Sequence, residues 1–331
     1  MHSASFHRMA RDGPGVVCLH ANPGTLAPWR SLSERLAPDW RVVTPQAYGP
    51  PRGPGRPADP APTLADELEA LAPVFDAAGE RFHLVGHSWG GALALRAALA
   101  FPDRVESVAV YEPPLFALLR ADDARHPDLE RLAEVVRAGA EAVARGEPEA
   151  AARSFIDFWA QPGAFDAMPP GRRAQILSTI ECIGSWWRVL HEDPTPLSTF
   201  ARLRAPVLLM TGRDTRAAAR SVAEALVAAL PGIQVVRFDG LGHMGPLTHP
   251  ERVLPVIESF LSTRRAARMA QGPEGGDSGR PDPSDFALVS HWAHDAASAA
   301  GGVLAGRAAV PPRPSSDPGD CQEALFASPP V

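Results

Sequence analysis

The chain of 331 residues is long enough for one large α/β domain or two smaller ones, and its apolar share of 45% is ordinary for a soluble globular protein. The net charge is −6, and all 32 basic residues are arginines that form no basic cluster, which argues against a nucleic-acid partner. The absence of lysine also excludes mechanisms that need a lysine base or a Schiff base.

The sequence carries no sign of a membrane, secreted or zinc-binding protein. No run approaches the roughly 18 apolar residues of a membrane span, and the first residues lack the apolar core of a secretory signal. The three cysteines, Cys18, Cys182 and Cys321, are too few and too scattered for a disulfide framework or a zinc site. We therefore expect a cytoplasmic protein, and the oligomeric state is left open.

The first part of the chain alternates predicted strands and helices. They are a strand at Ser5–Met9, a strand at Val16–His20, a helix at Pro28–Leu36 and a strand at Arg41–Pro45. The segment Tyr48–Pro62 is dense in Pro, Gly and Arg, which predicts an irregular surface loop near the cleft. Thr63 is expected to cap a helix that runs to Ala77, with Glu67 near the capping-box position.

A nucleophile elbow is predicted around Ser88. The apolar run Phe82–Val85 is suited to a buried strand, and Gly90–Ala100 has high helix propensity. Between them, Gly86-His87-Ser88-Trp89-Gly90 fits the pattern G-x-S-x-G, in which a sharp strand-to-helix turn pushes a serine hydroxyl into a cleft. The helix directs backbone N–H groups and its positive dipole end toward the same point, where they would stabilise an anionic intermediate.

At this motif the chain resembles the α/β-hydrolase superfamily, whose elbow often reads GHSWGG. The resemblance implies a predominantly parallel sheet flanked by helices, with a helical cap insertion. It also implies that the loop after the second strand, Ala21-Asn22-Pro23-Gly24, supplies an oxyanion-hole N–H from Asn22, paired with the N–H of Trp89. Ala21 stands where the family usually has glycine.

Haloalkane dehalogenases look similar at Asn22 and Trp89, but their nucleophile is aspartate. A carboxylate that attacks an alkyl halide forms an ester, which water cleaves, whereas Ser88 would form a stable ether. The serine therefore favours a carbonyl substrate.

Two carboxylates compete for the role of triad acid. Val207–Gly212 is a predicted strand followed by Asp214, the usual position of the acid in the superfamily. Glu112 directly follows the predicted strand Val105–Tyr111, where some members keep their acid. Asp214 is the preferred assignment and Glu112 the alternative.

His243 is the expected general base. It lies in a glycine-rich loop after the predicted strand Gln234–Phe238, so the order Ser88, Asp214, His243 matches the superfamily. His249 is the competing histidine, but it precedes Pro250 at a predicted helix start and suits a capping role.

The predicted division of the chain follows the places where predicted strands alternate with helices and where they are absent. Residues 1–114 and 204–264 form the two parts of the hydrolase core, 115–203 form the helical cap, and 265–331 form a disordered low-complexity tail. About two of six cap aromatics are expected to face the cavity; the six are Phe155, Phe158, Trp159, Phe165, Trp186 and Trp187.

The predicted function is hydrolysis of a small-molecule carboxylic ester or related acyl compound through an acyl-enzyme, with no metal or organic cofactor. The alternatives on the same fold are a C–C bond hydrolase, a thioesterase, an aminopeptidase and an acyltransferase. From another class, the chain is a catalytically inactive protein that binds a small ligand.

Overall fold

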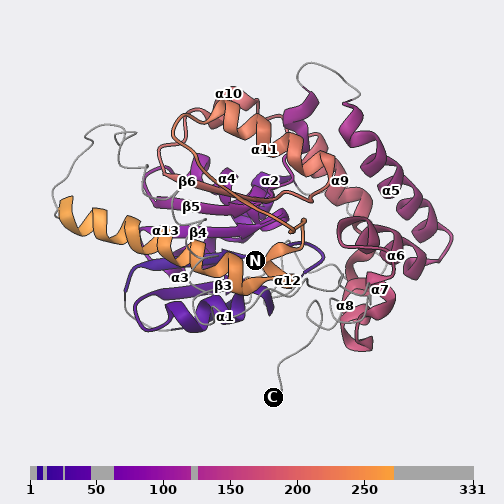
Figure 1. Ribbon diagram of the computed structural model, residues 1–331, viewed down its shortest axis with the longest axis horizontal. Coiled ribbons are helices and arrows are strands. Elements are labelled where there is room, and N and C mark those ends of the chain that lie inside the picture. The colour runs from indigo at the N-terminus through magenta and orange to yellow at the C-terminus, as the bar shows by residue number, and fades with distance from the viewer. Residues whose placement is uncertain (1–5, 10–12, 25–26, 46–62, 121–125, 272–331) are drawn as a thin grey trace, which may run out of the picture.

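The structure is a computed structural model that describes residues 6–9, 13–24, 27–45, 63–120 and 126–271 (Figure 1). The expected loop at Tyr48–Pro62 and the part of the expected tail beyond residue 271 fall outside these residues.

The described residues form one seven-stranded sheet in the order β1-β3-β2-β4-β5-β6-β7. Its strands are β1 (Phe6–Met9), β2 (Gly15–Leu19), β3 (Arg41–Pro45), β4 (Phe82–His87), β5 (Val105–Tyr111), β6 (Val207–Gly212) and β7 (Gln234–Phe238). Among these strands, only β1 and β3 pair antiparallel. The predicted fold class, a mostly parallel sheet flanked by helices, is therefore confirmed.

Helices cover both faces of the sheet because its central strands, β2, β4, β5 and β6, are apolar and buried almost throughout. They are α1 (Ala27–Leu36), α2 (Leu64–Ala70), α3 (Ala72–Ala78), α4 (Trp89–Ala100), α11 (Ala217–Ala229), α12 (Gly245–Thr248) and α13 (Pro250–Gln271). Val16 and Cys18 of β2 pack with α1 and α13 in one core cluster. Val17 and Leu19 of the same strand belong to a second cluster, which includes α3, α4 and α11.

The described residues between β5 and β6 form helices and no strand. These are the 3₁₀ helix η1 (Phe116–Arg120), α5 (Pro127–Ala144), α6 (Pro148–Trp159), α7 (Ala164–Ala167), α8 (Pro170–Ile180), α9 (Ile183–His191) and α10 (Leu197–Phe200). Figure 1 shows α5 to α8 gathered at one side of the sheet. The contacts that join this insertion to the core include two hydrogen bonds: Ser221 Oγ donates to Asp128, and Arg216 Nε donates to the Phe158 carbonyl at 2.5 Å.

Three predicted helix features differ from the structure. The helix expected from Thr63 to Ala77 is broken into α2 and α3, because Pro73 near the start of α3 has no N–H to donate to the preceding turn. The capping-box partner of Thr63 is Asp66 instead of Glu67, with an Asp66 Oδ2 to Thr63 N distance of 2.6 Å. The last helix, α13, runs to Gln271 and so includes residues 265–271, which were expected to belong to the tail.

No helix in the described part of the chain combines the length and the apolar character that a bilayer crossing needs.

Candidate active site

Ser88 lies at a strained turn between β4 and α4, as the elbow motif predicts. Its φ is +52°, a value that residues other than glycine rarely adopt. The turn requires glycine on either side: a Cβ on Gly86 would lie 2.4 Å from the Gly90 carbonyl oxygen, and one on Gly90 would lie 2.2 Å from that of Leu19. The N–H of Ser88 donates to the Tyr111 carbonyl at 3.0 Å, which ties the elbow to β5.

His243 reaches Ser88 from the loop after β7. The distance between His243 Nε2 and Ser88 Oγ is 3.0 Å. Two side chains hold the loop by its backbone: Tyr111 donates its hydroxyl to the Gly242 carbonyl at 2.8 Å, and His87 Nε2 donates to the His243 carbonyl at 2.8 Å. Burial, with the nearby charge of His243, lowers the pKa of His87 to about 3, so this ring is a neutral donor. The structure thus brings the predicted nucleophile and base together.

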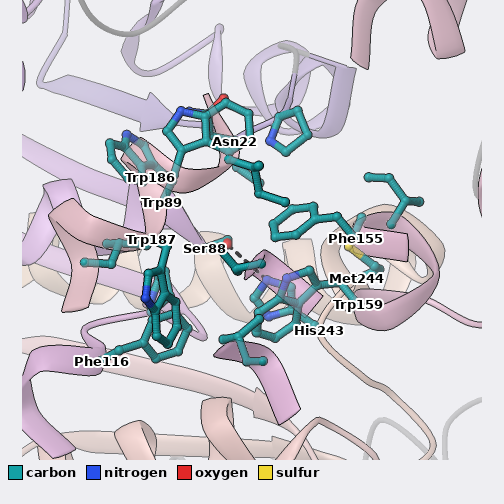
Figure 2. Close-up of a pocket in the computed structure, with 18 residues that line it drawn as sticks. Asn22, Ser88, Trp89, Phe116, Phe155, Trp159, Trp186, Trp187, His243 and Met244 are labelled. Carbon is teal, nitrogen blue, oxygen red and sulfur yellow. Dashed lines mark hydrogen bonds between the residues drawn. The ribbon is translucent and has the colours of Figure 1, made fainter. Parts of the chain in front are cut away.

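The carboxylate in contact with His243 is that of Glu112. Its Oε2 lies 2.8 Å from His243 Nδ1. Glu112 directly follows β5 and has a φ of +44°, so a second strained backbone position lies beside the first. Ser88, His243 and Glu112 therefore form one continuous chain of hydrogen bonds (Figure 2 shows the first two).

The Glu112 carboxylate receives further hydrogen bonds from the end of β6 and the loop that follows. Thr211 Oγ1 and the Gly212 N–H donate to Oε1 at 2.9 and 2.8 Å, and Thr215 Oγ1 donates to Oε2 at 2.6 Å. Burial alone raises the pKa of a carboxyl, but here the bonds from His243, Thr215 and Gly212 outweigh it and hold the pKa of Glu112 below its usual range. The buried carboxylate is thus kept ionised.

Asp214, the acid preferred from the sequence, is not at His243. Its side chain is exposed, and its backbone N–H donates to the Leu241 carbonyl at 2.9 Å. The correction has a physical reason. Because β5 and β6 are neighbours, with Tyr111 opposite Met210, the loops after both strands open at the same edge of the sheet. Two carboxylates were thus available at that edge, and Glu112 is the one directed inward.

His249, the competing histidine, bonds Thr248 Oγ1 through Nδ1 at 2.8 Å, beside the start of α13. Asn22 and Trp89 line the same cavity as Ser88 and His243 (Figure 2). Their backbone role as oxyanion donors stays a prediction.

The cavity beside Ser88 has a volume of about 70 Å³ and mostly apolar walls. Four of the six cap aromatics line it, twice the number expected: Phe155 and Trp159 from α6, and Trp186 and Trp187 from α9. The Trp159 ring centroid lies 4.3 Å from that of His243, so the insertion touches the base directly. Phe116 of η1, which the sequence did not single out, packs against Trp187 with ring centroids 5.6 Å apart.

Among the described residues, no three His, Cys, Asp or Glu side chains are placed to hold one metal ion.

Comparison with known proteins gives consistent matches. Residues 14–250 match a family described as alpha/beta hydrolase fold. The chain is 30% identical to lipase LipV of Mycobacterium tuberculosis, over 78% of this chain and 97% of that protein. It is 25% identical to 2-hydroxy-6-oxo-6-phenylhexa-2,4-dienoate hydrolase of Burkholderia cepacia, over 76% and 89%. A solved alpha/beta hydrolase from Sphaerobacter thermophilus aligns with a TM-score of 0.55 at 27% identity, over 78% and 95%.

Proposed function

The chain belongs to the α/β-hydrolase family, and from this premise we propose that it is a serine hydrolase that cleaves a small-molecule carboxylic ester or a related acyl compound. The observation that carries the proposal is the hydrogen-bonded chain from Ser88 Oγ through the His243 ring to Glu112, in which the two bonds measure 3.0 and 2.8 Å. A serine beside a base that is itself oriented by a carboxylate is the arrangement of nucleophilic acyl transfer.

In the proposed reaction, His243 Nε2 takes the proton of Ser88 as Oγ attacks the substrate carbonyl. Glu112 accepts a hydrogen bond from Nδ1–H, which fixes the tautomer with a free Nε2 and stabilises the imidazolium that forms. The backbone N–H groups of Asn22 and Trp89 hold the oxyanion. His243 then protonates the departing alcohol and an acyl-enzyme remains. A water molecule activated by His243 releases the acid and restores Ser88.

A second candidate, cleavage of a carbon–carbon bond, is favoured by the similarity to the Burkholderia hydrolase. The same serine would attack a ketone carbonyl in that reaction. The two candidates differ in the bond that breaks, so product analysis with an ester and with a ring-cleavage diketone distinguishes them.

Fluorophosphonate labelling followed by intact mass spectrometry tests the proposal directly. We expect one adduct on the wild-type protein, mapped to Ser88, and none on Ser88→Ala. The matched control Ser178→Ala removes an exposed hydroxyl of α8 and keeps the adduct. A folded wild-type protein that takes no label, or a Ser88→Ala variant that still hydrolyses p-nitrophenyl acetate at the wild-type rate, contradicts the proposal.

A further inference from the structure

Building on the proposed function, we propose that the acyl group accepted at Ser88 is uncharged, apolar and short. The acyl group stays bonded to Ser88 Oγ through both steps of acyl transfer, whereas the alcohol leaves after the first. The acyl group is therefore the part of the substrate that the cavity around Ser88 has to hold.

The described walls of this cavity offer no partner for a charge. Among the described residues that line it, His243 is the only titratable side chain, and both of its ring nitrogens are already engaged, with Ser88 and Glu112. The other lining side chains are apolar or aromatic apart from Asn22. A carboxylate at the end of an acyl chain would lose its water there without gaining a cation from the described walls, and an unpaired buried charge is strongly unfavourable.

The closely packed helices at the cavity wall limit the length of the acyl group. Leu132 of α5 and Ile183 of α9 line the cavity and are 1% exposed each, so little water borders them. The two helices meet at Gly139, where an added Cβ would lie 3.1 Å from the Ile183 side chain. The two helices are therefore closely packed at this point. The volume of about 70 Å³ suits a short acyl group and not a long fatty acyl chain.

A matched pair of esters separates charge from shape. Ethyl 4-methylpentanoate and monoethyl succinate carry acyl groups with the same number of non-hydrogen atoms and the same branching, but the second ends in a carboxylate. We expect kcat/KM for the neutral ester to exceed that for the charged one by about 100-fold, because the carboxylate is desolvated without a partner.

A charge placed in the wall should reverse part of this preference. Phe155 lines the cavity and is half-buried, so Phe155→Arg can reach the acyl group without entering the fully buried core. We expect this variant to lower the ratio of kcat/KM for the neutral ester to kcat/KM for the charged ester at least 10-fold. Leu177→Arg is the control, because Leu177 is a half-buried residue of α8 that is not among the lining residues, and its ratio should stay at the wild-type value.

Equal kcat/KM values for the two esters, or a preference for monoethyl succinate, would overturn the inference while leaving the serine hydrolase proposal intact. Turnover of ethyl dodecanoate faster than ethyl butanoate would overturn the size limit. If neither short ester is cleaved and Ser88 also fails to react with a fluorophosphonate, the proposed function itself is wrong. If Ser88 is labelled but only charged esters are cleaved, the inference alone fails.

Discussion

At the scale of single residues, Glu112 and Asp214 allow a direct comparison, because one carboxylate is buried against His243 and the other is exposed. In Glu112→Gln an amide nitrogen can face His243 Nδ1 and donate to it, which moves the ring proton to Nε2 and blocks acceptance of the Ser88 proton. We expect kcat to fall about 10³- to 10⁴-fold, measured with p-nitrophenyl acetate.

Asp214→Asn is the matched control for this substitution. Its kcat should stay within about threefold of wild type, since changes to exposed side chains away from the site have small effects. Loss of activity in Asp214→Asn together with normal activity in Glu112→Gln would restore Asp214 as the acid. Circular dichroism of both variants checks that the fold is intact.

Thr215 is expected to act as a positioning residue for Glu112. Its hydroxyl donates to Oε2, the same oxygen that contacts His243, and it lowers the pKa of the carboxyl. Thr215→Val removes this donor, so we expect kcat to fall about 10-fold at unchanged KM. The pKa of Glu112 should rise in this variant, because the carboxylate has lost a donor.

Two further variants separate this effect from a general loss of packing. Thr215→Ser keeps the hydroxyl and should restore kcat. Thr211→Val removes a bond to Oε1, the oxygen that does not contact His243, and should have the smaller effect. A kcat in Thr215→Val equal to that of the wild type would show that the Thr215 hydroxyl does not position Glu112.

At the scale of helices and strands, how well the sequence predicts an element depends on whether its signal is local. The strands at 105–111, 207–212 and 234–238 have the predicted bounds. The first two are buried in the parallel sheet, and each is marked by its own apolar run. The elbow is also local, since only glycine fits two positions before and two positions after Ser88. The order Ser88, acid, His243 is satisfied by Glu112 as well as by Asp214, so chain order does not distinguish the two carboxylates.

The features that the sequence analysis missed depend on contacts between distant segments. Helical spacing shows that Phe155 and Trp159 share a face of one helix, but not that this face meets the cavity. Thr211 and Thr215 carry no pattern that marks them as donors to a residue about 100 positions earlier. Only the pairing of β5 with β6 brings these side chains together.

At the scale of the whole molecule, two buried histidines of β4 predict how stability depends on pH. His83 bonds Ser107 Oγ through Nδ1 at 2.7 Å, and its Nε2 lies 3.2 Å from Glu106. Glu106 is already paired with Arg81 and Arg268, so it offers little stabilisation to a charged imidazole. Burial, and then the charges of these two arginines, lower the pKa of His83 to about 4. The other histidine is His87, with a pKa of about 3.

Both folded-state pKa values lie below the ordinary histidine value of about 6.5. Between that value and pH 4 the unfolded chain therefore binds protons that the folded chain does not, and stability falls as the pH falls. Linkage predicts a loss in the free energy of unfolding of about 2 kcal/mol per histidine from pH 7 to pH 5.

Urea unfolding followed by tryptophan fluorescence at constant ionic strength measures this loss. In His83→Gln the side chain at position 83 cannot titrate, so the free energy of unfolding should fall about half as much between pH 7 and pH 5 as it does in the wild type. Between pH 7 and pH 8 the variant should lose no more than the wild type. An equal loss in the variant and the wild type would show that His83 does not contribute to this pH dependence.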